Sequence, residues 1–269
     1  MKTLKTILAH VYLIIMGLFF LFPLLFMIRT SLVPENKYFV LPPTLSFNLE
    51  HYKAVLFNSN FQKYIFNSFI ISVTVVAIVL IIGGMAGYSL ARYNFKRKKD
   101  FLFFVLTTRM GPPVAFALPF YILFIKLHLI DTYTGLVLIY ILSNLAFGIW
   151  MSYSFFKDIP VAFEEAARID GATKLQTIRK VVLPLAAPGL LATGILIFIL
   201  TWNEYFYAFI LTRLNAKTFP VHLPSFFGAY QIDWGQMFAA STIATLPVLL
   251  FGILIQKYLV RGLTFGAID

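Results

Sequence analysis

Long apolar runs separated by short polar segments dominate the chain, and charged residues concentrate between the runs. Six runs approach the roughly 20 residues that a helix needs to cross a bilayer core of about 30 Å. The pattern predicts an all-α polytopic membrane protein with six transmembrane helices. The predicted helices cover about residues 6–29, 64–91, 101–125, 133–155, 188–211 and 236–257. Pro112 and Pro113 lie inside the third run and are expected to kink or break that helix.

Composition excludes a soluble globular protein. The 269 residues are 60% hydrophobic and only 12% charged, about half the charged fraction of a typical soluble domain. The absence of cysteine excludes a disulfide framework and thiol chemistry. The first apolar run, residues 7–28, is too long for a signal peptide and lacks a small-residue cleavage site, so we interpret it as a retained helix. Without a low-complexity linker or an internal repeat, residues 1–269 are expected to form a single transmembrane domain.

The net charge of +11 is not arranged as in a nucleic-acid-binding protein. Basic residues instead gather in short loops between apolar runs, most densely in RYNFKRKK at residues 92–99. The excess of Lys and Arg predicts that both termini are cytoplasmic. This orientation places residues 156–187 in the cytoplasm and residues 30–63 and 212–235 outside.

The polar stretch 156–187 has the local signals of two short helices joined by a turn. Asp158 is expected to cap the first helix, and Gly171 suits a left-handed position at its end. Thr173 and Gln176 have the spacing of a capping box for the second helix, and Pro184 bars simple continuation of that helix.

An apolar stripe at helical spacing follows these two helices. The stripe consists of Ala162, Ala166, Ile169, Leu175, Ile178 and Val182. It suits the docking of a soluble partner. The alternative is an amphipathic loop that lies on the membrane surface.

The stretch resembles a known motif. Glu165-Ala166-Ala167, three residues, Gly171, nine residues and then Val181-Val182-Leu183-Pro184 match the EAA motif of ABC-importer permeases, with Val181 in place of the usual Ile. The fuller form EEAARIDGAT, the Trp202-Asn203-Glu204 triplet and the ending GLTFGAID resemble the carbohydrate-uptake (maltose-type) branch. The resemblance covers nearly the whole chain and implies the type I importer permease fold with a cytoplasmic coupling helix.

The resemblance implies that this segment docks in a groove of an ATPase subunit and transmits its movement. Glu165 would be a charged anchor for a basic residue, and Ala166 and Ala167 would allow close approach. The coupling residues it implies are Glu164, Glu165, Ala166, Ala167, Asp170, Gly171, Ala172, Leu183 and Pro184. In maltose-type permeases the C-terminal tail also reaches the ATPases, so residues 262–269 are expected to do so or to fray as a free terminus.

The resemblance also implies the partners. They are a second, similar permease, two cytoplasmic ATPase subunits, an extracytoplasmic solute-binding protein, the sugar and the lipid membrane. The chain has no G-x-x-x-x-G-K-[ST] phosphate loop, so ATP and Mg²⁺ are expected on the ATPase subunits and no cofactor on this chain. Its four histidines lack metal-ligand spacing, and no nucleophile–base arrangement stands out. We therefore expect a transport subunit of a bacterial or archaeal cytoplasmic membrane that is not itself an enzyme.

Charged residues inside apolar runs are costly and mark candidate substrate contacts. The candidates are Arg109 in the third run and Trp202, Asn203, Glu204 and Tyr205 in the fifth. Arg109 and Glu204 could instead pair with each other, or Arg109 could extend to the membrane interface. Trp and Tyr are also common at ordinary membrane interfaces.

By the same resemblance, the outer segment 212–235 would probe the ligand site of a docked binding protein. Its available aromatic side chains are Phe226, Phe227, Tyr230 and Trp234; a passive linker is the alternative. Three rival functions remain open: an ABC-importer permease for a non-sugar solute, an autonomous secondary transporter, and a membrane-tethered scaffold. Secondary transporters usually show internal repeats, which this sequence lacks.

Overall fold

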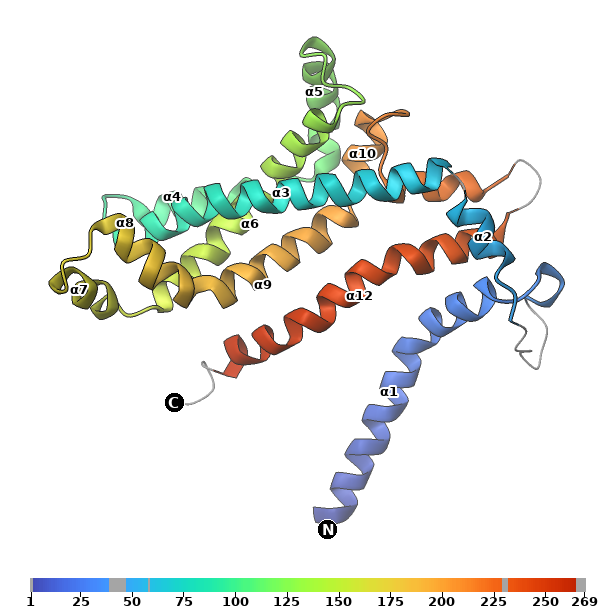
Figure 1. Cartoon of the computed structure of the whole chain (residues 1–269), viewed down its shortest axis with the longest axis horizontal. Coiled ribbons are helices and arrows are strands. Elements are labelled where there is room, and N and C mark those ends of the chain that lie inside the picture. Colours follow the sequence, from blue (N-terminus) through green and yellow to red (C-terminus); the bar gives the residue numbers. More distant parts are fainter. Residues whose placement is uncertain (1, 39–46, 58, 229–231, 265–269) are drawn as a thin grey trace. The chain divides into compact units, whose positions relative to one another are not determined.

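The computed structural model describes residues 2–38, 47–57, 59–228 and 232–264, and in these the regular structure is helical apart from one isolated antiparallel bridge, Phe227–Ile232. Five helical stretches are long and apolar enough to cross a membrane: Thr6–Ser31, Asn60–Arg92, Tyr133–Asp158, Lys174–Trp202 and Trp234–Gln256. A shorter apolar helix, Pro113–Lys126, completes the set. The all-α prediction is confirmed (Figure 1).

The chain divides into two compact units. The first unit comprises Met1–Lys63 and His222–Pro247. Its helices are α1 (Lys2–Ser31), η1 (Glu35–Lys37), α2 (Glu50–Leu56), η3 (Leu223–Phe226) and the first part of α12 (Trp234–Thr264). Asp233 begins α12 by accepting the Gln236 backbone N–H at 2.9 Å, the usual bond of an N-terminal cap.

The second unit comprises Tyr64–Val221 and Val248–Asp269. It contains most of α3 (Ser59–Arg92), then α4 (Lys98–Thr107), α5 (Pro113–Lys126), α6 (Tyr133–Asp158), α7 (Ala162–Ile169), α8 (Lys174–Thr177), η2 (Ile178–Val182), α9 (Leu183–Trp202) and α10 (Phe206–Leu211). The short helix α11 (Phe219–His222) follows. The core of the unit lies between α3, α5, α6, α9 and α10, and includes Val75, Phe124, Ile139, Ile197 and Leu211.

Helices α3 and α6 approach each other through small residues. A Cβ added at Gly87 would lie 2.7 Å from the Cβ of Ser152, and one added at Gly83 would lie 3.0 Å from the backbone of Gly148. Gly83 and Gly87 are four residues apart and share one helix face, which is the spacing that lets membrane helices pack closely.

Two predicted transmembrane helices are each divided in two. The third, 101–125, is α4 followed by α5, and Pro112 stands immediately before α5 in an extended conformation that a helix cannot contain. The predicted break is therefore confirmed. The fifth, 188–211, begins earlier than predicted and stops at Trp202, and α10 then starts at Phe206. The prediction of one continuous fifth helix is wrong.

One local prediction for residues 156–187 is also wrong. Asp158 is the last residue of α6 and does not cap α7; Val161 occupies the N-cap position of α7 and makes no side-chain cap. Helical structure continues from Lys174 through Pro184 to Trp202, but it passes through a wider turn before the proline. The π-helical turn Ile178–Val182 precedes the proline. This wider turn shifts the hydrogen-bond register of the helix and so accommodates the proline.

Candidate functional site

Helix α7 and the turn after it have the geometry that the sequence predicts. Gly171 has φ +84°, which is strained for residues with a Cβ. The Gly171 N–H donates to Arg168 O and the Ala172 N–H to Ala167 O, both at 3.0 Å, which is the hydrogen-bond pattern of a Schellman motif. Thr173 and Gln176 form the predicted capping box at the start of α8.

The apolar stripe divides between surface and core. Ile169 and Leu175 are 86% and 74% exposed, and neighbouring Phe163 is 51% exposed. At the other end of the stripe Val182 is buried in a cluster with Tyr88, Phe156 and Ala186, against which Ile178 packs. We use the name α7–α8 face for the exposed stripe residues together with their exposed neighbours Phe163 and Glu165: Ala162, Phe163, Glu165, Ala166, Ile169 and Leu175.

The two consecutive glutamates of α7 have opposite environments. Glu165 is exposed, whereas Glu164 is 1% exposed. Arg92 Nε donates to Glu164 Oε1 at 2.5 Å, and the Tyr88 hydroxyl donates to Oε2 at 2.9 Å. The Glu164 carboxylate therefore binds within the chain and does not face outward as a docking anchor. Arg92 and Tyr88, which lie more than seventy residues away, were not predicted from the sequence.

The other predicted coupling residues lie at or near the surface of this region. Ala166, Asp170, Gly171, Leu183 and Pro184 are exposed, and Ala167 and Ala172 are half-buried. Leu183 and Pro184 begin α9 rather than lying on α7 or α8.

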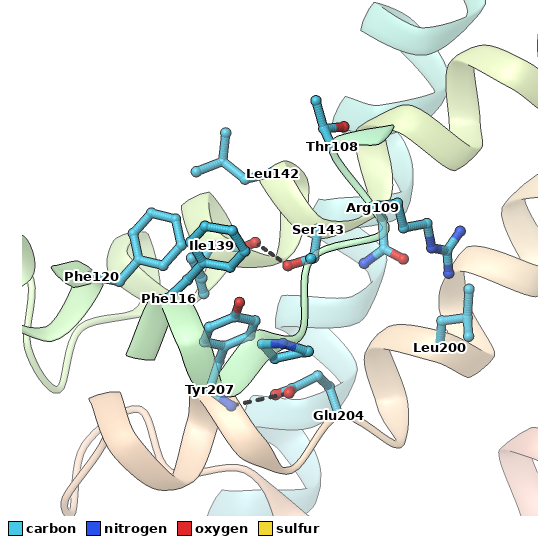
Figure 2. Close-up of a pocket in the computed structure, with 13 residues that line it drawn as sticks. Thr108, Arg109, Phe116, Phe120, Ile139, Leu142, Ser143, Leu200, Glu204 and Tyr207 are labelled. Carbon is cyan, nitrogen blue, oxygen red and sulfur yellow. Dashed lines mark hydrogen bonds between the residues drawn. The ribbon is translucent and has the colours of Figure 1, made fainter. Parts of the chain in front are cut away.

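A cavity of about 600 Å³ opens beside the breaks in the third and fifth predicted helices. Arg109 lies in the turn between α4 and α5, and Glu204 lies in the turn between α9 and α10; both line the cavity (Figure 2). Aromatic rings and polar groups make up much of the rest of the wall: Thr108, Phe116, Phe120, Ser143, Asn144 and Tyr207.

Arg109 and Glu204, both among the described residues, do not form the ion pair that was one predicted alternative. The Arg109 guanidinium lies 4.8 Å from the centre of the Phe147 ring, a cation–π distance. Glu204 accepts the backbone N–H groups of Tyr207 and Ala208 at 3.0 and 3.3 Å (Figure 2 draws the first). Glu204 thus supports the start of α10 while bordering the cavity.

The remaining three predicted substrate contacts are not among the residues that line this cavity. Trp202 is buried and stacks on Phe198, with ring centres 5.5 Å apart. Asn203 donates its side-chain N–H to Ile199 O and closes the end of α9. Tyr205 stacks on Phe209. Each serves local structure at the break in the helix.

Ser143 and Asn144 of α6 line the cavity but were missed from the sequence. They are adjacent polar residues inside an otherwise apolar run, and this signal could have identified them. Asn144 is buried and donates to Tyr140 O at 2.9 Å.

In the outer segment, Phe227 is 52% exposed, Phe226 packs near His222, and Trp234 lies against Phe238 at the start of α12. Phe227 is therefore the most accessible of the predicted aromatic residues that the structure describes. Tyr230 lies outside the described residues, as do residues 265–269 of the predicted tail.

The segment after α10 is fixed by Asp131, which was also not predicted from the sequence. Its carboxylate accepts backbone N–H groups from Arg213, Leu214, Asn215 and Ala216 at 2.9–3.1 Å. Burial alone would raise the pKa of Asp131, but these bonds outweigh it and hold the pKa below the ordinary value.

Comparison with known proteins bears on the whole chain. The chain is 35% identical over 273 residues to the trehalose/maltose transport system permease protein MalG of Thermococcus litoralis, covering 99% of this chain and 98% of that protein. It is 35% identical over 242 residues to the trehalose transport system permease protein SugB of Mycobacterium tuberculosis, covering 89% and 87%.

Solved structures of transporter chains have a similar fold. A chain of a bacterial ABC transporter involved in importing the acidic polysaccharide alginate superimposes with TM-score 0.79 at 27% identity, covering 96% of this chain and 97% of that one. A chain of the MetNI methionine ABC transporter, at 18% identity and TM-score 0.58, covers 79% of this chain and 98% of its own and shares the fold. Residues 79–265 match the family described as binding-protein-dependent transport system inner membrane component, and the chain belongs to this family of transporter permeases.

Proposed function

We propose that the chain is one of two membrane-spanning subunits of an ATP-driven carbohydrate or polyol importer, and that the α7–α8 face docks on a separate ATPase. The observation that carries the docking proposal is the exposure of Phe163, Ile169 and Leu175 on helices outside the apolar core. Large apolar side chains gathered on a polar, charged segment suit a protein partner. Glu165 adds an exposed carboxylate to the same face.

The remaining partners are proposed on the same basis. They are a second permease subunit, two ATPase subunits that bind ATP and Mg²⁺, and an extracytoplasmic binding protein. This chain would bind no nucleotide and catalyse no reaction itself. The α7–α8 face must then be cytoplasmic, which agrees with the orientation predicted from the Lys- and Arg-rich loops and places both termini in the cytoplasm.

A carbohydrate cargo is proposed from the relatives and from the chemistry of the cavity. Relatives named for trehalose and maltose transport match almost the full chain. Phe116, Phe120 and Tyr207 give aromatic faces, and Ser143 and Asn144 give hydrogen-bonding groups. Sugars present both apolar C–H faces and hydroxyl groups, so this mixed wall fits them.

The test is reconstitution with the genomically neighbouring permease, ATPase and binding protein. ATP hydrolysis would be measured with a panel of sugars, polyols and amino acids. We expect one carbohydrate or polyol to stimulate hydrolysis and to be taken up. Stimulation by an amino acid alone would overturn the cargo, and uptake without any ATPase would overturn the importer mechanism.

The docking surface is tested with Glu165→Arg in the same complex. We expect this variant to lose substrate-stimulated hydrolysis because it replaces the exposed carboxylate with a cation. The matched control is Asp158→Arg, a charge reversal at another exposed acid, at the end of α6 and outside the α7–α8 face. Equal behaviour of the two variants would contradict the assignment of Glu165.

A further inference from the structure

Glu164 is the single buried residue of α7. The other seven residues of the helix are exposed or half-buried. The Glu164 carboxylate is bound directly by Arg92 and Tyr88 of α3. Arg168, one turn further along α7, lies 3.7 Å from the same carboxylate and is itself largely exposed.

The guanidinium of Arg92 joins three helices at one point. Besides its bond to Glu164, Nη1 donates to Phe156 O at 2.8 Å and Nη2 donates to Ile159 O at 3.1 Å. Phe156 is in the last turn of α6, and Ile159 follows that helix. The ends of α3 and α6 and the start of α7 thus share one planar, hydrogen-bonded group.

A buried ion pair is a weak way to gain stability, because removing both charges from water is costly. An apolar contact of similar size would join α7 to α3 at least as well. What the ion pair adds is a fixed orientation of the helices, because a guanidinium holds a carboxylate and carbonyl oxygens in a fixed planar geometry. A contact of fixed geometry is useful where the movement of one helix must be transmitted to another.

We propose that the Arg92–Glu164 pair, supported by Tyr88, transmits the movement of α7 into α3. The inference rests on the proposed function, in which α7 docks on the ATPase. It gives the two neighbouring glutamates separate tasks, with Glu165 contacting the partner and Glu164 passing the movement inward. The three residues are positioning residues, because none of them is required to touch substrate or nucleotide.

The experiment compares Glu164→Gln, Arg92→Lys and Tyr88→Phe with Glu165→Gln in the complete reconstituted transporter. Copurification of the ATPase, ATP hydrolysis and substrate taken up per ATP hydrolysed are measured together. We expect Glu164→Gln and Arg92→Lys to retain the ATPase but to lower uptake per ATP about tenfold. Tyr88→Phe removes one hydrogen bond and is expected to lower the ratio less. Glu165→Gln is expected to weaken ATPase retention instead.

A second readout separates transmission of movement from simple structural support. Hydrogen exchange of residues 86–92 in α3 and 162–169 in α7 is compared between nucleotide-free and ATP-trapped complexes. In the unsubstituted protein both segments are expected to respond to ATP. In Glu164→Gln the α7 segment should still respond, while the α3 segment should not.

The possible failures are distinguishable. If Tyr88→Phe and Glu164→Gln keep both the normal uptake per ATP and the α3 response, the inference fails while the importer remains. If α3 does not respond to ATP in the unsubstituted complex, the inference also fails, whether or not the variants fold. If no ATPase is retained by the unsubstituted chain, the proposed function itself fails.

Discussion

Asp131 binds the backbone N–H of Asn215 through both of its carboxylate oxygens, each at 3.0 Å, although the two residues are 84 positions apart. Asp131 has φ +56°, a left-handed conformation that Asp tolerates better than most residues. The Leu211 carbonyl in turn accepts the Asp131 backbone N–H at 2.8 Å. The loop before α6 thereby holds the segment that follows α10.

Asp131→Asn is expected to destabilise the chain by about 2 kcal/mol, because hydrogen bonds to a charged acceptor contribute more than neutral ones and the new amide N–H₂ would face N–H donors. The measurement is thermal unfolding in detergent. Asp233→Asn is the control, since Asp233 caps α12 with a single backbone N–H. A smaller loss for Asp131→Asn than for Asp233→Asn would contradict the importance of the cluster of bonds.

The Asp131 carboxylate is also expected to make the stability of the chain depend on pH. Because the folded pKa of Asp131 lies below its ordinary value of 3.8, its stabilisation is complete above the ordinary pKa and is lost as the pH falls through the lowered one. The stability difference between the unsubstituted chain and Asp131→Asn is therefore expected to be constant above about pH 5 and to shrink below about pH 4. A difference that grows on acidification would reverse the assigned sign.

Local signals in the sequence predicted local structure well. The long apolar runs, the turn at Gly171, the Thr173–Gln176 capping box and the break at Pro112 each depend on a few neighbouring residues, and the structure confirms them. Helical structure continues through Pro184 because a π-helical turn before it accommodates the proline. No pattern in the sequence predicts such a turn.

Contacts between distant segments could not be predicted from one sequence. The coupling motif identified Glu164, but no sequence pattern indicates that it pairs with Arg92. In the sequence Arg92 is one of several basic residues of the loop 92–99. Asp131 was missed for the same reason. The cavity was half predicted: Arg109 and Glu204 stand out as charges in apolar runs, whereas Trp202 turned inward to pack on Phe198.

Close packing of α3 on α6 predicts different outcomes at two neighbouring glycines. Gly87→Ala would place a Cβ 2.7 Å from Ser152 Cβ and from the Tyr153 backbone, so the helices must separate, at a cost of about 1–3 kcal/mol. Gly84→Ala is the control, because a Cβ there meets nothing within 4 Å. Thermal unfolding should show a loss for Gly87→Ala and little change or a slight gain for Gly84→Ala. The reverse order would mean that α3 packs through another face.

Glu204 is expected to act at least partly as the cap of α10. Glu204→Ala leaves the Tyr207 and Ala208 N–H groups without their acceptor and is expected to cost about 1 kcal/mol of stability. Glu204→Gln retains a carbonyl oxygen and should lose less. Unfolding of the two variants tests the cap, and uptake tests the cavity wall. If uptake falls in Glu204→Gln while stability is kept, the negative charge itself acts in the pathway.

Gly171 has room for a side chain but a backbone conformation that disfavours one. Its substitution therefore tests the backbone of the turn between α7 and α8 without a steric clash. A Cβ at this position would meet nothing within 4 Å, but φ +84° is unfavourable for a side-chain-bearing residue. Gly171→Ala is expected to cost about 1–2 kcal/mol locally, and Gly171→Asn less, because Asn tolerates left-handed conformations. The strain can be relieved by turning α7, which carries Glu164 away from Arg92. We therefore expect uptake per ATP in the reconstituted transporter to be highest for the unsubstituted chain, lower for Gly171→Asn and lowest for Gly171→Ala. Equal ratios for all three proteins would show that the orientation of α7 does not depend on this turn.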